Sequence, residues 1–124
     1  MDANGHLQAI AAFRTVGGLS PWVAPNLLAR VYGGDAPDSD SLLWSRLGGS
    51  RELALAAGPL LSEGEDRRLW LRLGLACDFA DMGATVLGTR RSGFSPWTTG
   101  LALATYAVSA LLTTAALRSV APSR

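Results

Sequence analysis

The chain contains no lysine: all eleven of its basic side chains are arginine. It also has only one cysteine, Cys77, and one histidine, His6. A single cysteine excludes an internal disulfide, and without cysteine or histidine pairs the usual zinc-binding spacings are absent. The glycines have no phosphate-loop spacing either, so no nucleotide site is indicated. We therefore expect no metal ion and no other cofactor.

The chain also lacks an excess of either sign of charge, because eleven basic and ten acidic residues give a net charge of only +1. No basic run alternates with aromatic side chains, and we expect no nucleic-acid partner. The length of 124 residues predicts one domain over residues 1–124. The first residues lack a basic stretch before their apolar run, which is unlike a cleaved signal peptide. We therefore expect the first hydrophobic segment to be retained.

The most informative run is residues 98–117, which contains no charged side chain. About twenty residues, at a rise of about 1.5 Å each, span a hydrocarbon core of roughly 30 Å. A soluble helix of this length normally has a polar face, and this run offers only Thr, Ser and Tyr. The run therefore predicts a transmembrane helix.

Three further apolar segments precede this run and are interrupted by charges near their centres. Many of the remaining charges lie in the connections at 30–40, 63–68 and 90–91. We predict an all-α fold, a four-transmembrane-helix bundle with helices at 7–24, 41–61, 67–88 and 97–118. Such a protein would be a multi-pass component of a bacterial inner membrane. A soluble helical bundle stays open as an alternative, because a mean hydropathy of +0.21 and 17% charged residues fit it as well.

The charges at the segment centres form the candidate site. A charged side chain at mid-bilayer costs roughly 2.5–3.5 kcal/mol, so several at one depth indicate a paired internal belt. Arginine stays protonated, and with three acids against two arginines we expect one acid to hold a proton near neutral pH. Such a group is a general acid in chemical terms. The predicted catalytic residues are Arg14, Arg51, Glu52, Asp78, Asp81 and Tyr106.

The third predicted helix has two contrasting faces. Asp78 and Asp81 are three residues apart and share one face, which we expect to point inward. On roughly the opposite side small residues recur every four positions, a pattern that lets a neighbouring helix approach closely. We expect tight packing along this ridge, which is Ala76, Ala80, Ala84 and Gly88.

Two stretches together resemble a known group of proteins. They are the run SRLGGSRELAL at 45–55 and the Asp78-x-x-Asp81 spacing in the next helix. They resemble uncharacterised small four-helix integral membrane proteins of GC-rich bacteria. The resemblance implies the four-helix fold and an inward polar belt, and it implies no reaction.

Three classes of function fit these features. The first is a membrane-embedded enzyme that uses its carboxylates as general acid and base on a lipophilic small molecule, in a cyclisation, an isomerisation or an epoxide opening. The second is a small proton-coupled carrier that acts as a dimer. The third is an accessory or structural membrane subunit whose belt only holds the bundle together. The partners expected are therefore the lipid bilayer and a lipophilic substrate, with a homo-oligomer or a larger membrane partner left open.

Overall fold

The computed structural model describes residues 1–120, and residues 121–124 of the predicted domain lie outside them. The described part is all helical and consists of five helices. Four are long: α1 (Ala3–Val23), α3 (Ser39–Leu61), α4 (Gly64–Ser92) and α5 (Pro96–Ser119). The fifth, α2 (Pro25–Val31), is a short helix in the connection between α1 and α3. The all-α prediction is thus confirmed for these residues.

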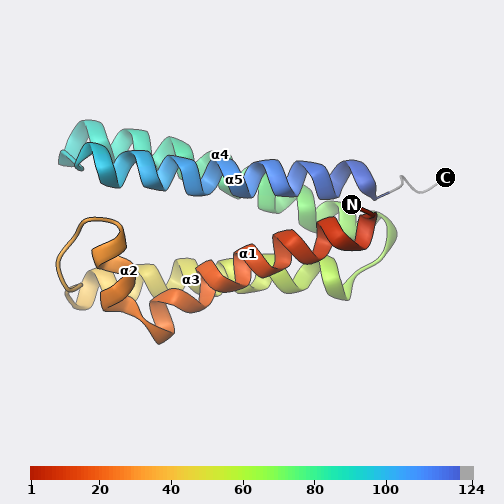
Figure 1. Cartoon of the computed structure of the whole chain (residues 1–124), viewed down its shortest axis with the longest axis horizontal. Coiled ribbons are helices and arrows are strands. Elements are labelled where there is room, and N and C mark those ends of the chain that lie inside the picture. The colour runs from red at the N-terminus through yellow and green to blue at the C-terminus, as the bar shows by residue number, and fades with distance from the viewer. Residues whose placement is uncertain (121–124) are drawn as a thin grey trace.

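The long helices form two packed pairs. Helix α1 packs along α3, and α4 packs along α5 (Figure 1). The two pairs meet through contacts of α1 with α5 and of α3 with α4. The N-terminus, the α3–α4 turn and the end of α5 lie at one end of the molecule, and α2 lies at the other (Figure 1).

Local sequence signals explain where the helices begin and end. Asp2 and Ser95 precede α1 and α5, and each side chain accepts a hydrogen bond from a backbone N–H in the first turn. Such caps satisfy donors that have no partner within the helix. Helix α4 ends at Gly93, which has a φ of +68°. Glycine adopts this left-handed conformation without a Cβ penalty, and it lets the chain reverse into α5.

Asp38 caps α3 in the same manner, and its ionisation should make this helix sensitive to acid. Its side chain accepts a hydrogen bond of 2.8 Å from the backbone N–H of Ser41, which lowers the pKa of the carboxyl below its usual value. A lowered folded-state pKa stabilises the fold above the unfolded-state value of about 3.9 and ceases to do so as pH falls through the folded-state value.

We therefore expect Asp38→Ala to lower the melting temperature at pH 7, and the deficit to shrink as the pH falls below about 4. Circular dichroism melts of the two proteins under the same solution conditions would measure this. Asp38→Asn is the control, because asparagine also caps helices well but does not titrate. A deficit of the same size at every pH would contradict the assignment of the effect to the carboxylate.

The connection that contains α2 differs from what a pattern of Pro, Gly and Asp suggests. The Pro, Gly and Asp residues of 25–41 predict a loop, yet Pro25–Val31 is helical. Proline is well suited to the first position of a helix, since its fixed φ is helical and its missing N–H would have no partner there. The hydrogen bonds from Trp97 Nε1 to Val31 O at 2.8 Å and from Thr98 Oγ1 to Tyr32 O at 2.6 Å tie this segment to α5.

Only α5, among the helices of residues 1–120, is long and apolar enough to cross a membrane by length and composition. Its most apolar stretch has a mean hydropathy of 1.6. The prediction of four spanning helices is therefore not established. For α3 and α4 the reason lies in their charges, because both carry ionisable groups at their ends and at the belt, which lowers their hydropathy.

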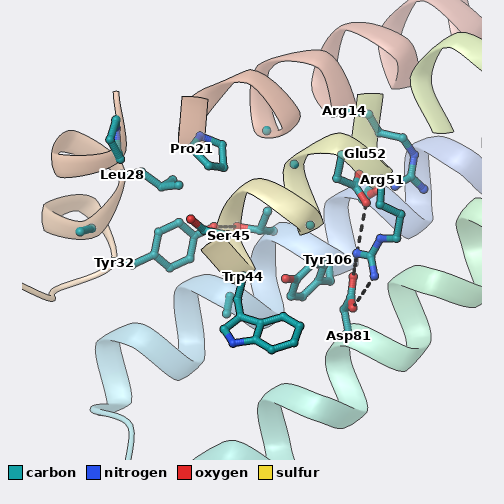
Figure 2. Close-up of a pocket in the computed structure, with 18 of the residues that line it drawn as sticks. Arg14, Pro21, Leu28, Tyr32, Trp44, Ser45, Arg51, Glu52, Asp81 and Tyr106 are labelled. Carbon is teal, nitrogen blue, oxygen red and sulfur yellow. Dashed lines mark hydrogen bonds and ion pairs between the residues drawn. The ribbon is translucent and has the colours of Figure 1, made fainter. Parts of the chain in front are cut away.

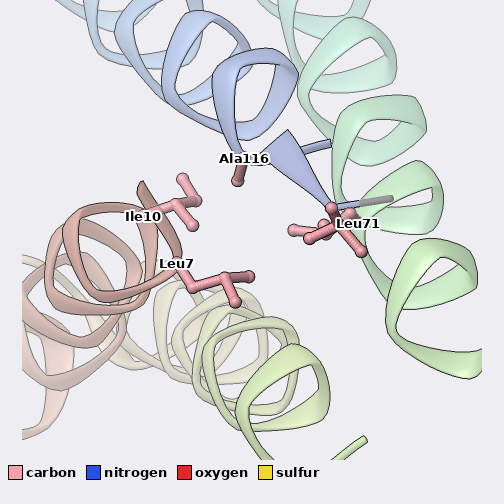
Figure 3. Close-up of a cluster of buried hydrophobic side chains, with 5 residues drawn as sticks. Leu7, Ile10, Leu71 and Ala116 are labelled. Atoms are coloured by element: carbon pink, nitrogen blue, oxygen red, sulfur yellow. The ribbon is translucent and has the colours of Figure 1, made fainter. Parts of the chain in front are cut away.

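The hydrophobic core is small and lies at the end of the molecule where α1 begins and α5 ends. Its residues come from α1, α4, α5 and the position after α5 (Figure 3). Burial of a large aliphatic side chain stabilises a fold by about 1.5–3 kcal/mol in water. This cluster joins three helices at one end and leaves the middle of the bundle to polar residues. It consists of Leu7, Ile10, Leu71, Ala116 and Val120.

The expected tight packing of the small-residue ridge on α4 is wrong within this chain. Ala76, Ala80 and Ala84 are exposed, and only Gly88 contacts another segment, at Phe94. Helix α4 contacts its neighbours through other faces, and one of these carries the acids. The small residues do form a ridge along α4, but within residues 1–120 no helix lies against it.

Candidate functional site

A cavity of about 580 Å³ lies between the middle of the bundle and the end that holds α2. All five helices contribute to its lining. Much of the wall is apolar or aromatic, with Phe13, Leu28, Trp44 and several prolines. Ionisable side chains border it on the side of the bundle centre, as Figure 2 shows. The volume is within the range of about 300–1,000 Å³ typical of small-molecule sites.

Arg14 of α1 is the centre of a buried ion cluster. Its guanidinium donates to Asp78 of α4 through two hydrogen bonds, Nη1 to Oδ1 at 3.2 Å and Nη2 to Oδ2 at 2.8 Å. It also donates to Glu52 Oε2 of α3 at 2.7 Å and to Thr113 Oγ1 of α5 at 3.2 Å. Arg14 therefore bonds to all three other long helices while being only 2% exposed.

Asp78 is the most deeply buried acid of the cluster, at 1% exposure. Besides Arg14 it accepts from the hydroxyl of Ser109, which lies 3.0 Å from both carboxylate oxygens. Gly74, one turn earlier in α4, makes room for the guanidinium, since a Cβ there would be 2.8 Å from Arg14 Nη2. A carboxylate held by charge-assisted bonds on both oxygens is a strong positional constraint. The Arg14–Asp78 pair thus acts as a lock between α1, α4 and α5.

A second cluster lies nearer to the open part of the cavity. Arg51 of α3 donates to Asp81 of α4 through Nη2 to Oδ2 at 2.5 Å and Nη1 to Oδ1 at 3.3 Å. Its Nη2 also lies 3.4 Å from Glu52 Oε1, so Glu52 bridges the two clusters (Figure 2). The side chains of Arg51, Asp81 and Glu52 are 41%, 17% and 19% exposed. These three are therefore the belt charges that a molecule in the cavity can reach.

Two tyrosines complete the polar lining. Tyr32, which follows α2, shares a hydrogen bond of 2.8 Å with Thr105 of α5. Tyr106 is half-buried beside this position, and within residues 1–120 its hydroxyl has no hydrogen-bond partner. A phenol that faces a cavity in this way can donate to, or accept from, a bound molecule.

All six residues predicted from the sequence therefore border this one cavity. The structure brings together Arg14, Arg51, Glu52, Asp78, Asp81 and Tyr106 from four helices, and it divides them into a buried lock and an accessible group. A catalytic role for them stays a prediction. Within residues 1–120 no group of three or more acidic, histidine or cysteine side chains is arranged to hold a metal ion.

Several polar residues of the site were not predicted, among them Ser109, Thr113 and Tyr32. Ser109 and Thr113 hold Asp78 and Arg14, and Tyr32 closes the end of the cavity. A signal for the first two was present in the sequence. Ser109 and Thr113 are one helical turn apart and share a face with Tyr106. Tyr32 had no such signal, because its place depends on how α2 folds back.

Comparisons of the chain with protein-family models, with curated proteins and with solved structures give no match. The resemblance to small four-helix membrane proteins therefore stays an expectation from the residues alone. The function has to be argued from the geometry of the site.

Proposed function

We propose that the protein is embedded in a bacterial inner membrane through α1, α3, α4 and α5, as a multi-pass four-helix bundle. The outside of the molecule supports this proposal, because large apolar side chains are exposed along all four helices. Extended apolar surface of this kind marks contact with a membrane or a partner. Only 22% of the most apolar stretch of α5 is buried inside the molecule, whereas the central helix of a soluble bundle is mostly covered.

The placement of the charges supports the same proposal. In α4 the only charged residues between Arg72 and Arg90 are Asp78 and Asp81, and both turn inward. Helix α5 has no charge before Arg118. Polar groups therefore lie inside at mid-depth and outside at the ends, the reverse of a water-soluble bundle. Intramembrane charges that pair in the interior of a bundle commonly mark a functional site.

We further propose that this membrane protein is an enzyme that acts on a lipophilic small molecule in the cavity. The observation that carries the proposal is the cavity itself, with apolar walls and with Glu52, Asp81, Arg51 and Tyr106 accessible on one side. An acid at this position can protonate an olefin or an epoxide, and a nearby carboxylate can stabilise the resulting cation or remove a proton. The reaction class is a cyclisation, an isomerisation or an epoxide opening.

The residues divide into two roles under this proposal. Asp81 and Glu52 are the proton donor and acceptor, and the hydroxyl of Tyr106 contacts the substrate. Arg51 is a positioning residue, because it donates to both oxygens of the Asp81 carboxylate. Arg14 and Asp78 position the helices from which these groups extend.

One observation favours a second candidate, an accessory membrane subunit. Each of the three belt acids already has an arginine partner within 3.4 Å, as a purely structural network would require. In that case the cavity would hold only lipid or water, and the protein would co-purify with a larger membrane partner.

Native mass spectrometry of the gently solubilised protein separates the two candidates. For the enzyme we expect a bound lipophilic molecule in the wild-type protein that is lost in Asp81→Asn, since the variant removes an accessible acid of the cavity. Asp35→Asn is the matched control, because Asp35 lies in the exposed α2–α3 connection and does not border the cavity. A stoichiometric protein partner, with no small molecule that depends on Asp81, would overturn the enzyme proposal.

A further inference from the structure

The charges that border the cavity do not balance. Its lining contains three carboxyl groups, of Glu52, Asp78 and Asp81, against the two guanidinium groups of Arg14 and Arg51. Within residues 1–120 no other Asp, Glu, Arg or His residue lines it. With all acids ionised, the site has a formal charge of −1. A lone charge in a poorly solvated interior is costly, so either a proton or a cation must neutralise it.

The geometry places the surplus negative charge on the accessible side. Arg14 is fully engaged by Asp78 and Glu52, and Arg51 binds Asp81 closely. Glu52 receives only a long contact of 3.4 Å from Arg51 on its second oxygen. The carboxylates of Glu52 and Asp81 together therefore have more negative charge than Arg51 alone neutralises. Both are partly exposed beside the cavity, whereas Asp78 is not.

The groups that face this pair come from every surrounding element. Arg14 approaches from α1, Arg51 from α3 and Tyr106 from α5. Tyr32 lies on the side of α2, and Asp78 and Cys77 belong to α4. None of these supplies a further positive charge near neutral pH. Neutralisation thus depends on what enters the cavity from outside.

The rest of the wall suits the apolar part of such a molecule. Four aromatic rings line the cavity together with Leu28, Pro21 and Ala102, and they are those of Phe13, Tyr32, Trp44 and Tyr106. Aromatic faces attract cations, by about 0.5–1 kcal/mol at exposed sites and roughly 2 or more when water is excluded. A single positive charge on an apolar body matches both the charge count and the walls.

We infer that the cavity binds a lipophilic organic cation beside the Glu52 and Asp81 carboxylates, whose surplus negative charge the cation balances. The inference rests on the proposed function and deepens it, because a cation that forms from a neutral substrate during the reaction would lie against the same carboxylates and aromatic rings.

The test uses three probes of similar shape and different charge: tetraphenylphosphonium, tetraphenylborate and neutral triphenylmethane. Binding to the full chain in zwitterionic nanodiscs is measured by isothermal titration calorimetry, with empty nanodiscs as the reference. We expect tetraphenylphosphonium to bind at least ten-fold more tightly than tetraphenylborate.

Glu52→Gln is the decisive variant, because it leaves two balanced pairs, Arg14–Asp78 and Arg51–Asp81, and so preserves the fold. It should weaken tetraphenylphosphonium binding at least ten-fold, while Asp35→Asn should leave the affinity unchanged. Equal binding of the anion or of triphenylmethane, or a cation affinity unaffected by Glu52→Gln, would overturn the inference and leave the lipophilic cavity of the proposed function standing. If none of the three probes binds, the inference and the proposed function both fail.

Discussion

Replacing Arg14 with methionine should lower the free energy of unfolding by about 3–5 kcal/mol, the usual cost of breaking a buried ion pair on one side. The variant leaves Asp78, at 1% exposure, without a cation, and it removes the 2.7 Å bond to Glu52. It also removes the contacts that join α1 to the other three long helices at one point. Unfolding by sodium dodecyl sulfate from dodecylmaltoside micelles, followed by tryptophan fluorescence, would measure the loss.

A second substitution shows whether the loss of unfolding free energy comes from the unpaired charge of Asp78. In Arg14→Met/Asp78→Asn the buried carboxylate is gone, and part of the stability should return, with a coupling energy of about 1–3 kcal/mol between the two sites. Arg14→Lys should be intermediate, because an ammonium cannot bond to both oxygens of Asp78 and to Glu52 in the same geometry. If Arg14→Met unfolds at the same mole fraction of sodium dodecyl sulfate as the wild-type protein, Arg14 does not stabilise the contacts between the helices.

The level of the belt could be predicted because charge position along a helix is visible in a sequence. In an up-and-down arrangement, residues near the centres of successive helices lie at similar depth, and Arg14, Glu52 and Asp78 do meet there. Each of the four long helices also matches a predicted segment, although all of them start earlier than the pattern indicated. Capping residues such as Asp2 and Asp38 explain the earlier starts of α1 and α3.

Other features of the site depend on the rotation of each helix about its axis, which the sequence leaves open. The pattern did not show that the side chain of Asp78 is 1% exposed while that of Asp81, one turn later, is 17% exposed. The sequence also did not show whether a partner protein covers the ridge of small residues on α4. The position of a residue in the chain thus predicts its level along the helix bundle. The contacts between helices decide which of the residues at that level are accessible from the cavity.

The contact between α1 and α3 is the other place where a small substitution should have a large effect on stability. Gly18 and Gly49 face each other with their backbones in contact, and a Cβ at Gly49 would lie 2.5 Å from Gly18 O and 3.2 Å from the ring of Pro21. Backbone atoms cannot move aside as a side chain does. We expect Gly49→Ala to lower the free energy of unfolding by about 3 kcal/mol, at the upper end of the cost of overpacking.

The neighbouring glycine supplies a matched control in the same helix. A Cβ at Gly48 meets nothing within 4 Å, so Gly48→Ala should be neutral or stabilise α3 by up to about 1 kcal/mol through its higher helix propensity. The same detergent titration on the two alanine variants makes the comparison. Equal stabilities for the pair would mean that α1 and α3 do not approach as closely as the structure shows.

The contact between Gly18 and Gly49 also determines the geometry of the belt. The effect of Gly49→Ala should therefore extend beyond stability. Gly49 lies one turn before Glu52 on α3, and Gly18 lies one turn after Arg14 on α1. The close approach of the two backbones therefore brings the Arg14 guanidinium within 2.7 Å of the Glu52 carboxylate. A methyl group at Gly49 that separates the helices must lengthen this bond and weaken the coupling between the two positions. In a double-mutant cycle of Arg14→Met and Glu52→Gln, we expect a smaller coupling energy in the Gly49→Ala background than in the Gly48→Ala background.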